Sequence, residues 1–195
     1  ESRWTGPCAA ARAALGGRAV NTESQVDTVE LHKLLEGNKP ILLDGGMGTM
    51  LQAKGLKPGE PPELAALTHP DWLLDIHRAY VQAGAQIISA STFGANREKL
   101  ARTGRTVAEV VPPTVAIAKQ AAGDQALVAL DLGPIGQLLE PTGTLHFEDA
   151  VHMFKEVVQA GVPAGADLIF IETMTDLQET RAAVLAAKEC CDLPI

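Results

Sequence analysis

The stretch LIFIETMTD, residues 168–176, decides the fold of this chain. Four apolar residues are followed by a carboxylate, Glu172, and then by small polar residues. A continuous apolar run of this length is typical of a strand that is buried on both faces, as in a parallel sheet. Functional groups collect at the carboxyl ends of parallel strands, so Glu172 also indicates a site.

The same unit recurs along the chain. Apolar runs begin near residues 41, 87, 127 and 168, about 40 residues apart, with amphipathic segments between them. Strands that alternate with helices predict a parallel α/β fold, either a doubly wound sheet or a (β/α)8 TIM barrel. Eight such units need far more than 195 residues. We therefore expect about the first half of a barrel, with a fifth strand beginning at residues 192–195.

The segments between the runs predict helices with particular features. The helix within residues 69–84 is expected to turn four side chains inward: Trp72, Ile76, Ala79 and Tyr80. The adjacent Pro112 and Pro113 are expected to end one helix and start another, or to kink it. Asp176 is expected to cap the last helix, with Glu179 completing a capping-box pair.

Composition narrows the class of protein. The chain has 24 acidic and 16 basic side chains, a net charge of −8, and no basic cluster, so we expect no nucleic-acid or anionic-membrane partner. No apolar run approaches the ~18–20 residues that span a bilayer. Three cysteines are too few for a disulfide framework, which favours a reducing, cytoplasmic setting.

The first 27 residues differ from the rest of the chain. They are rich in Ala, Arg and Gly and have no apolar period. We expect them to form a disordered or non-native extension, followed by one domain at residues 28–195.

Three strand ends carry residues that allow chemistry. In LLDGGMGTMLQ, residues 42–52, Asp44 follows the first run, and Gly45 and Gly46 let backbone N–H groups approach a small ligand; a tight turn capped by Asp44 is the alternative. This stretch is not GxGxxG, so a dinucleotide site is not expected. Asp44 and Glu172 facing one cavity would hold one ammonium group, or would form an acid/base pair as in a hydrolase.

Two further loops follow the middle runs. In SASTFGANREKL, residues 89–100, Ser91 and Thr92 can donate to a carboxylate, or Asn96 simply caps the following turn. Asp131 ends the third run and is either a site carboxylate or a structural one. The five histidines form no HExxH motif, and His77 is expected to be a packing or surface residue.

Together these stretches resemble the homocysteine S-methyltransferase family. The resemblance rests on LLDGGMGTMLQ, on the segment from ELAALTHPDW to STFGANREKL, on VALDLGPIGQLLEPTGTL, and on AGADLIFIETMTDLQETRAAVLAAKE, and it covers residues 28–195. It is strongest to the amino-terminal homocysteine-binding module of cobalamin-dependent methionine synthases. It implies a (β/α)8 barrel that methylates the sulfur of homocysteine.

The resemblance also implies a substrate site. Asp44 and Glu172 would hold the amino group of homocysteine. The backbone around Gly45 and the loop of Ser91, Thr92 and Phe93 would meet its carboxylate. These are substrate-binding residues, and no catalytic residue is assigned.

The resemblance implies zinc held by three cysteines, which would stabilise the homocysteine thiolate. Cys190 and Cys191 match none of the family's zinc positions. They stand at the end of a helix, so we expect them to pack and not to bind metal.

Three functions are compatible with the sequence. The first is part of a methyltransferase that uses methylcobalamin, works with cobalamin and folate modules of a larger protein, and lacks activity alone; a stand-alone enzyme using betaine or S-methylmethionine is the close variant. The second is a non-catalytic half-barrel that needs a partner. The third is an unrelated (β/α)8 hydrolase.

Overall fold

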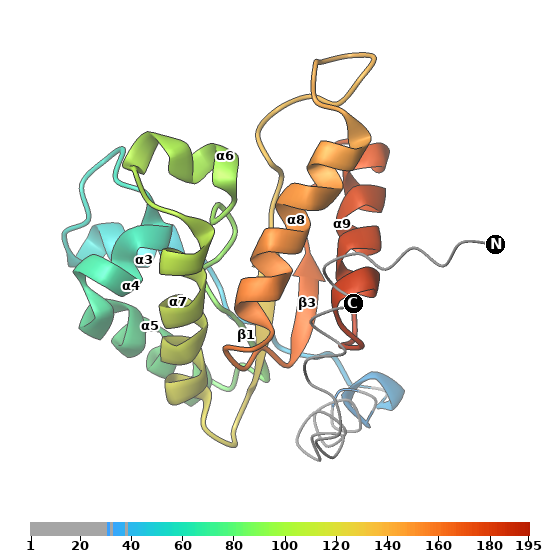
Figure 1. Ribbon diagram of the computed structural model, residues 1–195. Coiled ribbons are helices and arrows are strands. Elements are labelled where there is room, and N and C mark those ends of the chain that lie inside the picture. The colour runs from blue at the N-terminus through green and yellow to red at the C-terminus, as the bar shows by residue number, and fades with distance from the viewer. Residues whose placement is uncertain (1–30, 32, 38) are drawn as a thin grey trace.

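A computed structural model of the chain describes residues 31, 33–37 and 39–195. The predicted extension at residues 1–27 lies outside the described residues, as do residues 28–30 of the predicted domain. The described chain is a mixed α/β fold with parallel strands (Figure 1).

The sheet has three strands in the order β1-β2-β3. They are β1 (Ile87–Ser89), β2 (Leu127–Leu132) and β3 (Leu168–Ile171). Both pairings are parallel, with Ile87 opposite Leu127 and Ala129 opposite Leu168. Three of the four predicted runs therefore form the strands that the apolar pattern indicates.

The first predicted strand is less regular than expected. Residues 41–44 lie beside β1 through one isolated parallel bridge, between Leu43 and Ile87, and Leu42 and Leu43 are exposed. An edge segment has backbone partners on one side only, which favours such irregular pairing. At the other edge, residues 192–195 form no strand where the fifth was predicted, and one backbone bond, from the Ile169 N–H to the Pro194 carbonyl at 2.8 Å, joins them to β3.

Helices fill the intervals between the strands. They are α3 (Met47–Lys54), η1 (Pro62–Leu64), α4 (Ala65–Thr68), α5 (Pro70–Gln82), α6 (Arg97–Leu100), η2 (Ala101–Thr103), α7 (Val107–Ala122), α8 (Phe147–Gly161) and α9 (Leu177–Cys190). The long helices form a layer in which α5 packs on α7, α7 on α8, and α8 on α9 (Figure 1).

The two faces of β2 have different surroundings. Val128, Leu130 and Leu132 belong to the large core that the helices complete, whereas Leu127 and Ala129 belong to a smaller apolar cluster. Side chains alternate between the faces of a strand, so Asp131 continues the second face. We call this second face the inner face.

Helix α7 runs unbroken through Pro112 and Pro113. The first alternative, that these prolines end one helix and start another, is therefore wrong, whereas the alternative of a kink stays a prediction. The missing N–H groups would have bonded the carbonyls of Ala108 and Glu109, and both residues are exposed, so water can take the place of those bonds. The Thr114 hydroxyl donates to the Val110 carbonyl at 2.7 Å and supports the next turn.

The buried face of α5 differs from the prediction. Its buried residues are Leu73, Ile76, His77 and Val81. Ala79 is exposed, and Trp72 and Tyr80 are half-buried, so only Ile76 of the predicted set is fully inside. His77 is a packing residue whose ring nitrogens have no hydrogen-bond partner, and burial lowers its pKa to about 4.

One of the two contacts predicted for the cap of α9 is present. The Asp176 carboxylate accepts from the Gln178 N–H at 2.7 Å, as an N-cap should. Glu179 does not turn back to complete the pair; its carboxylate accepts from the Ile135 N–H at 2.7 Å. This contact fixes the loop that follows β2.

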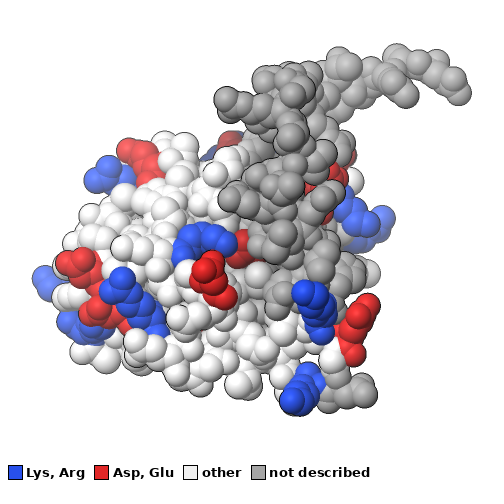
Figure 2. All heavy atoms as spheres, turned by 90° about the horizontal axis from the view of Figure 1, so that it is seen from below, with Lys and Arg blue, Asp and Glu red and all other residues white. Residues whose placement is uncertain are grey.

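The face seen from below carries Lys and Arg interspersed with Asp and Glu, without a gathering of one sign (Figure 2). Among the described residues, no helix is both long and apolar enough to cross a membrane.

Candidate functional site

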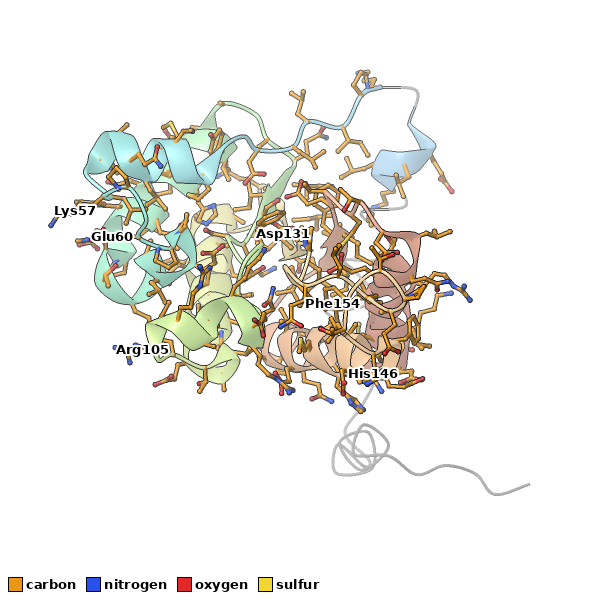
Figure 3. The ribbon with its side chains drawn as sticks, turned by 90° about the horizontal axis from the view of Figure 1, so that it is seen from above. Lys57, Glu60, Arg105, Asp131, His146 and Phe154 are labelled. Carbon is orange, nitrogen blue, oxygen red and sulfur yellow. The ribbon has the colours of Figure 1, made fainter. Side chains whose placement is uncertain are left out.

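The carboxyl ends of the strands surround a hollow of about 490 Å³. Its wall includes four carboxylic side chains: Asp44, Glu63, Asp131 and Glu172. No Lys, Arg or His stands among the described residues that line it. Seen from above, Asp131 lies centrally, whereas Lys57, Arg105 and His146 lie at the periphery (Figure 3). A hollow of this composition favours a ligand with a positively charged group.

Asp44 is held against the end of β1. Its N–H donates to the Ile87 carbonyl at 3.1 Å, and its Oδ2 accepts from the Ser89 N–H at 2.9 Å. Burial raises the pKa of Asp44 to about 6, against the lowering effect of the Ser89 hydrogen bonds, and the negative charge of Glu172 adds to the rise. Asp44 is therefore a carboxylate at neutral pH with one oxygen already engaged.

Asp131 is the most buried carboxyl group of the hollow, with 3% of its surface exposed. Its Oδ1 has no hydrogen-bond partner. Burial, then the charge of Glu172 and a hydrogen bond to it, and then the charges of Asp44 and Glu63 raise its pKa to about 8. With a pKa of about 8, Asp131 is mostly protonated at neutral pH.

The strand register explains why Asp131 and Glu172 meet. Asp131 lies opposite Phe170, and the Glu172 N–H donates to the Leu132 carbonyl at 3.2 Å. Asp131 on β2 and Glu172 after β3 both follow inner-face positions of neighbouring strands.

Glu63 was not predicted from the sequence. It belongs to η1, and its Oε1 accepts from the Gly94 N–H at 2.8 Å. A Cβ at Gly94 would collide with the Glu63 carboxylate, so this approach requires glycine. Glu63 follows no strand in the sequence, and only the contact across to Gly94 brings it to the hollow.

The N-terminus of α3 forms another part of the wall. Gly46, Met47 and Gly48 line the hollow, and no side chain caps the helix at Gly46. The first N–H groups of a helix are unpaired within the helix and carry partial positive charge. The hollow thus places anion-binding backbone beside cation-binding carboxylates.

Tyr80 supports this helix start from α5. Its hydroxyl donates to the Gly46 carbonyl at 3.1 Å. A Cβ at Gly45 would lie 3.1 Å from the same hydroxyl, so only glycine leaves the ring its full room. Burial, and then the charge of Asp44, raise the pKa of Tyr80.

The residues of the loop after β1 have two different roles. Ser91 and Phe93 line the hollow, and Ser91 adopts a left-handed backbone with φ of 55°. Thr92 is not among the lining residues; its hydroxyl accepts from the Asp131 N–H at 3.0 Å and donates to the Asp131 carbonyl at 2.9 Å. Thr92 therefore fastens the loop to β2. Asn96 caps α6 by accepting from the Lys99 N–H at 3.0 Å.

The described residues offer no site that fits zinc. No group of three or more His, Cys, Asp or Glu side chains among them is arranged to hold a metal ion. Cys191 packs against the large core, its thiol donates to the Ala187 carbonyl at 3.4 Å, and burial raises its pKa. A raised pKa favours the protonated thiol, which is a poor metal ligand.

Of the six predicted site residues, the structure brings five to the hollow: Asp44, Gly45, Ser91, Phe93 and Glu172. Thr92 stands behind the wall. Asp131, which the sequence left between a site role and a structural one, lines the hollow as well.

Comparison with known proteins identifies relatives of this architecture. A family model described as Homocysteine S-methyltransferase matches residues 41–195. The methionine synthase of Mycobacterium tuberculosis (strain ATCC 25618 / H37Rv) is 31% identical over 159 residues, which cover 74% of this chain and 13% of that protein. The methionine synthase of Mycobacterium leprae (strain TN) is 29% identical over 182 residues, covering 85% of this chain and 15% of that protein.

Solved structures of the homocysteine methyltransferase MmuM from Escherichia coli share the fold. The oxidized form has a TM-score of 0.71 at 24% identity and the match covers 82% of this chain and 62% of that one. The metallated form gives the same TM-score and identity, with 63% of that chain covered. The chain thus spans a small part of the methionine synthases and less than two thirds of the MmuM structures.

Proposed function

The chain belongs to the homocysteine S-methyltransferase family, and we propose that it binds homocysteine in the hollow at the carboxyl ends of its strands. The observation that carries this proposal is the wall of four carboxyl groups, without a basic side chain, beside an uncapped helix N-terminus. An α-amino acid has the complementary pair of charges.

The amino group of homocysteine would bind to Asp44 and Glu172. An ammonium group donates three hydrogen bonds, and hydrogen bonds between ionised partners are the stronger kind. Asp44 Oδ2 accepts from the Ser89 N–H, so its second oxygen would accept from the ammonium group.

The substrate carboxylate would bind to the start of α3 near Gly45, where backbone N–H groups and the helix dipole favour negative charge. Ser91 supplies a hydroxyl from the neighbouring loop, and Phe93 supplies an apolar wall. Thr92 would act on this contact by holding the loop in place.

Methyl transfer needs the thiol of homocysteine as its thiolate, because a free thiol with a pKa near ~8.5 is mostly protonated at neutral pH. The described residues do not fit zinc, so we place the three zinc cysteines of the family outside them. The chain would then be the homocysteine-binding part of about half a (β/α)8 barrel, inactive alone.

The methyl donor in the whole protein would be methylcobalamin, supplied by cobalamin and folate modules. The likeness to two methionine synthases favours this donor. A stand-alone enzyme using betaine or S-methylmethionine would bind the amino acid in the same hollow, and offering each donor to the whole protein tests the choice.

Calorimetric titration of the 195-residue chain with L-homocysteine, under reducing conditions, tests the proposal. The matched ligand is 4-mercaptobutanoic acid, which keeps the thiol and the carboxylate but lacks the amino group. We expect homocysteine to bind about 10- to 100-fold more tightly, since the ammonium–carboxylate bonds are lost in the analogue. Equal affinities would overturn the proposed site.

The placement of the zinc ligands has a separate test. The metal content of the purified chain, with homocysteine and zinc present and then dialysed, should be well below one zinc per chain. This outcome also suits a half-barrel without catalysis of its own. A firmly held zinc in a one-to-one ratio would show that the metal ligands lie within this chain.

A further inference from the structure

Among the described residues that line the hollow, Asp131 has a fully buried carboxyl oxygen without a hydrogen-bond partner. Asp131 is 3% exposed and lines the hollow, and its Oδ1 has no hydrogen-bond partner. By contrast, Asp44 Oδ2 accepts from the Ser89 N–H and Glu63 Oε1 accepts from the Gly94 N–H. A buried, unpartnered acceptor is costly unless a ligand satisfies it.

We propose that Asp131 is a further substrate-binding residue, whose unpartnered Oδ1 accepts one N–H of the substrate's ammonium group. The proton that Asp131 carries in the empty hollow then leaves to solvent. This inference rests on the proposed function, because it assumes that an amino acid occupies the hollow. It adds a third carboxyl contact and makes binding a proton-releasing event.

The number of donors and acceptors supports the assignment. An ammonium group has three hydrogens to donate. Asp44 follows the segment beside β1, Asp131 lies on β2 and Glu172 follows β3, and the charges of Asp44 and Glu172 both raise the pKa of Asp131. Each would therefore accept one hydrogen.

The charge balance explains why the proton leaves. The groups facing Asp131 are Glu172, Asp44 and Glu63, all acidic, with Lys99 acting on it from α6 behind the wall. In the empty hollow, one proton offsets one of these negative charges. When the ammonium group of an amino acid enters, it supplies the same positive charge among these carboxylates, so the proton departs to solvent. No bond within the ammonium group breaks.

A divalent cation is a less suitable occupant. The described side chains contain no group of three or more that is arranged to hold a metal ion, although four carboxyl groups line the hollow. Burial raises the pKa of Asp131 to about 8, which disfavours a metal because its ligands must be deprotonated.

The experiment uses L-methionine as the probe, because it carries the same amino and carboxylate groups without a titrating thiol. Calorimetric titration of the 195-residue chain at pH 7, in PIPES and in imidazole, separates the heat of binding from the heat of buffer protonation. We expect release of about one proton per methionine bound, and an affinity that rises up to about tenfold per pH unit between pH 6 and 8.

Asp131→Asn is the decisive variant. It should still bind methionine but release almost no proton, with an affinity nearly independent of pH over the same range. The matched control is Glu179→Gln, which changes another buried carboxyl group outside the hollow and should keep the wild-type proton release.

The outcomes separate the two proposals. If methionine and homocysteine both fail to bind the folded chain, the proposed function is overturned, and this inference with it. If they bind without proton release, or if Asp131→Asn keeps the wild-type pH profile, the inference alone is overturned.

Discussion

Asp167 and Asp131 are equally buried, each 3% exposed, but they stand at opposite ends of neighbouring strands in different surroundings. Asp167 precedes β3 and is fully engaged: Lys119 donates to its two oxygens at 2.7 and 2.9 Å, and the Val128 N–H donates at 2.7 Å. Asp131 lies near the carboxyl end of β2 with one oxygen unpartnered, and no basic side chain stands among the described residues that line the hollow. The first arrangement stabilises the fold, whereas the second is complete only with a ligand.

The largest expected effect is on the engaged aspartate. Asp167→Ala should lower the free energy of unfolding by about 3 kcal/mol, since it leaves the Val128 N–H and the Lys119 ammonium without their partner. Urea unfolding followed by circular dichroism measures the loss. Asp131→Asn serves as the comparison and should cost little; an equal loss in both variants would remove the distinction between the two aspartates.

The next effect is on binding. Glu172→Gln should weaken homocysteine binding by about 30- to 100-fold, because an ionised partner of the ammonium group is lost. Titration calorimetry gives the ratio. Asp124→Asn changes an exposed carboxylate and should bind like the wild type; a similar weakening there would mean that net charge, and not the hollow, governs affinity.

Two glycines extend the same contrast to backbone contacts. A Cβ at Gly161 would press on Leu130 in the large core, so Gly161→Ala should cost about 1–3 kcal/mol of stability and leave binding intact. A Cβ at Gly94 would press on Glu63, so Gly94→Ala should weaken homocysteine binding several-fold at a smaller cost in stability. Measuring both quantities for both variants checks the assignment, and a reversed pattern would contradict it.

The last effect is a pH dependence of stability, which is small within any one pH unit. The pKa of Asp131 rises from 3.8 to about 8 on folding, so the folded ligand-free chain keeps a proton that the unfolded chain releases. Stability should therefore fall as pH rises from about 4 to 8, by at most about 1.4 kcal/mol per unit for one proton. Asp44 acts in the same direction up to about pH 6.

The pKa shift of His77 gives a pH dependence of stability with the opposite sign. Its pKa falls from 6.5 to about 4 on folding, so its contribution is present above pH 6.5 and is lost as pH falls towards 4. Unfolding curves across pH 4–8 for the wild type and Asp131→Asn separate the two groups. A slope that survives in Asp131→Asn above pH 6.5 would assign it to another residue.

The strand ends were the predictable part of the site. Asp44 and Glu172 each follow an apolar run, and parallel strands bring such ends together regardless of the details between them. Asp131 follows the same rule, but its sequence could not show that its oxygen is left unpartnered. That depends on contacts in the folded chain: the Thr92 hydroxyl bonds the backbone N–H and carbonyl of Asp131, and not its side chain.

The other features of the fold and of the site depended on contacts between distant parts of the chain, which no local sequence pattern contains. Glu63 reaches the hollow only through the Gly94 N–H, 31 residues away. Pro112 and Pro113 remain in α7 because the carbonyls they leave unpaired face water, which is a property of how the helix lies on the core. The sequence predicted that Glu179 completes the cap of its own helix, but its carboxylate accepts from the N–H of Ile135 in the loop after β2.

Tyr80 makes the hollow optically observable. It is the single tyrosine of the chain, and the charge of Asp44 contributes to the raised pKa of its phenol. A ligand group that stays cationic at alkaline pH, bound beside Asp44, would offset that charge, so the phenol should then ionise at a lower pH. The ultraviolet absorbance of tyrosinate, recorded during an alkaline titration with and without ligand, would thus report occupancy without any label.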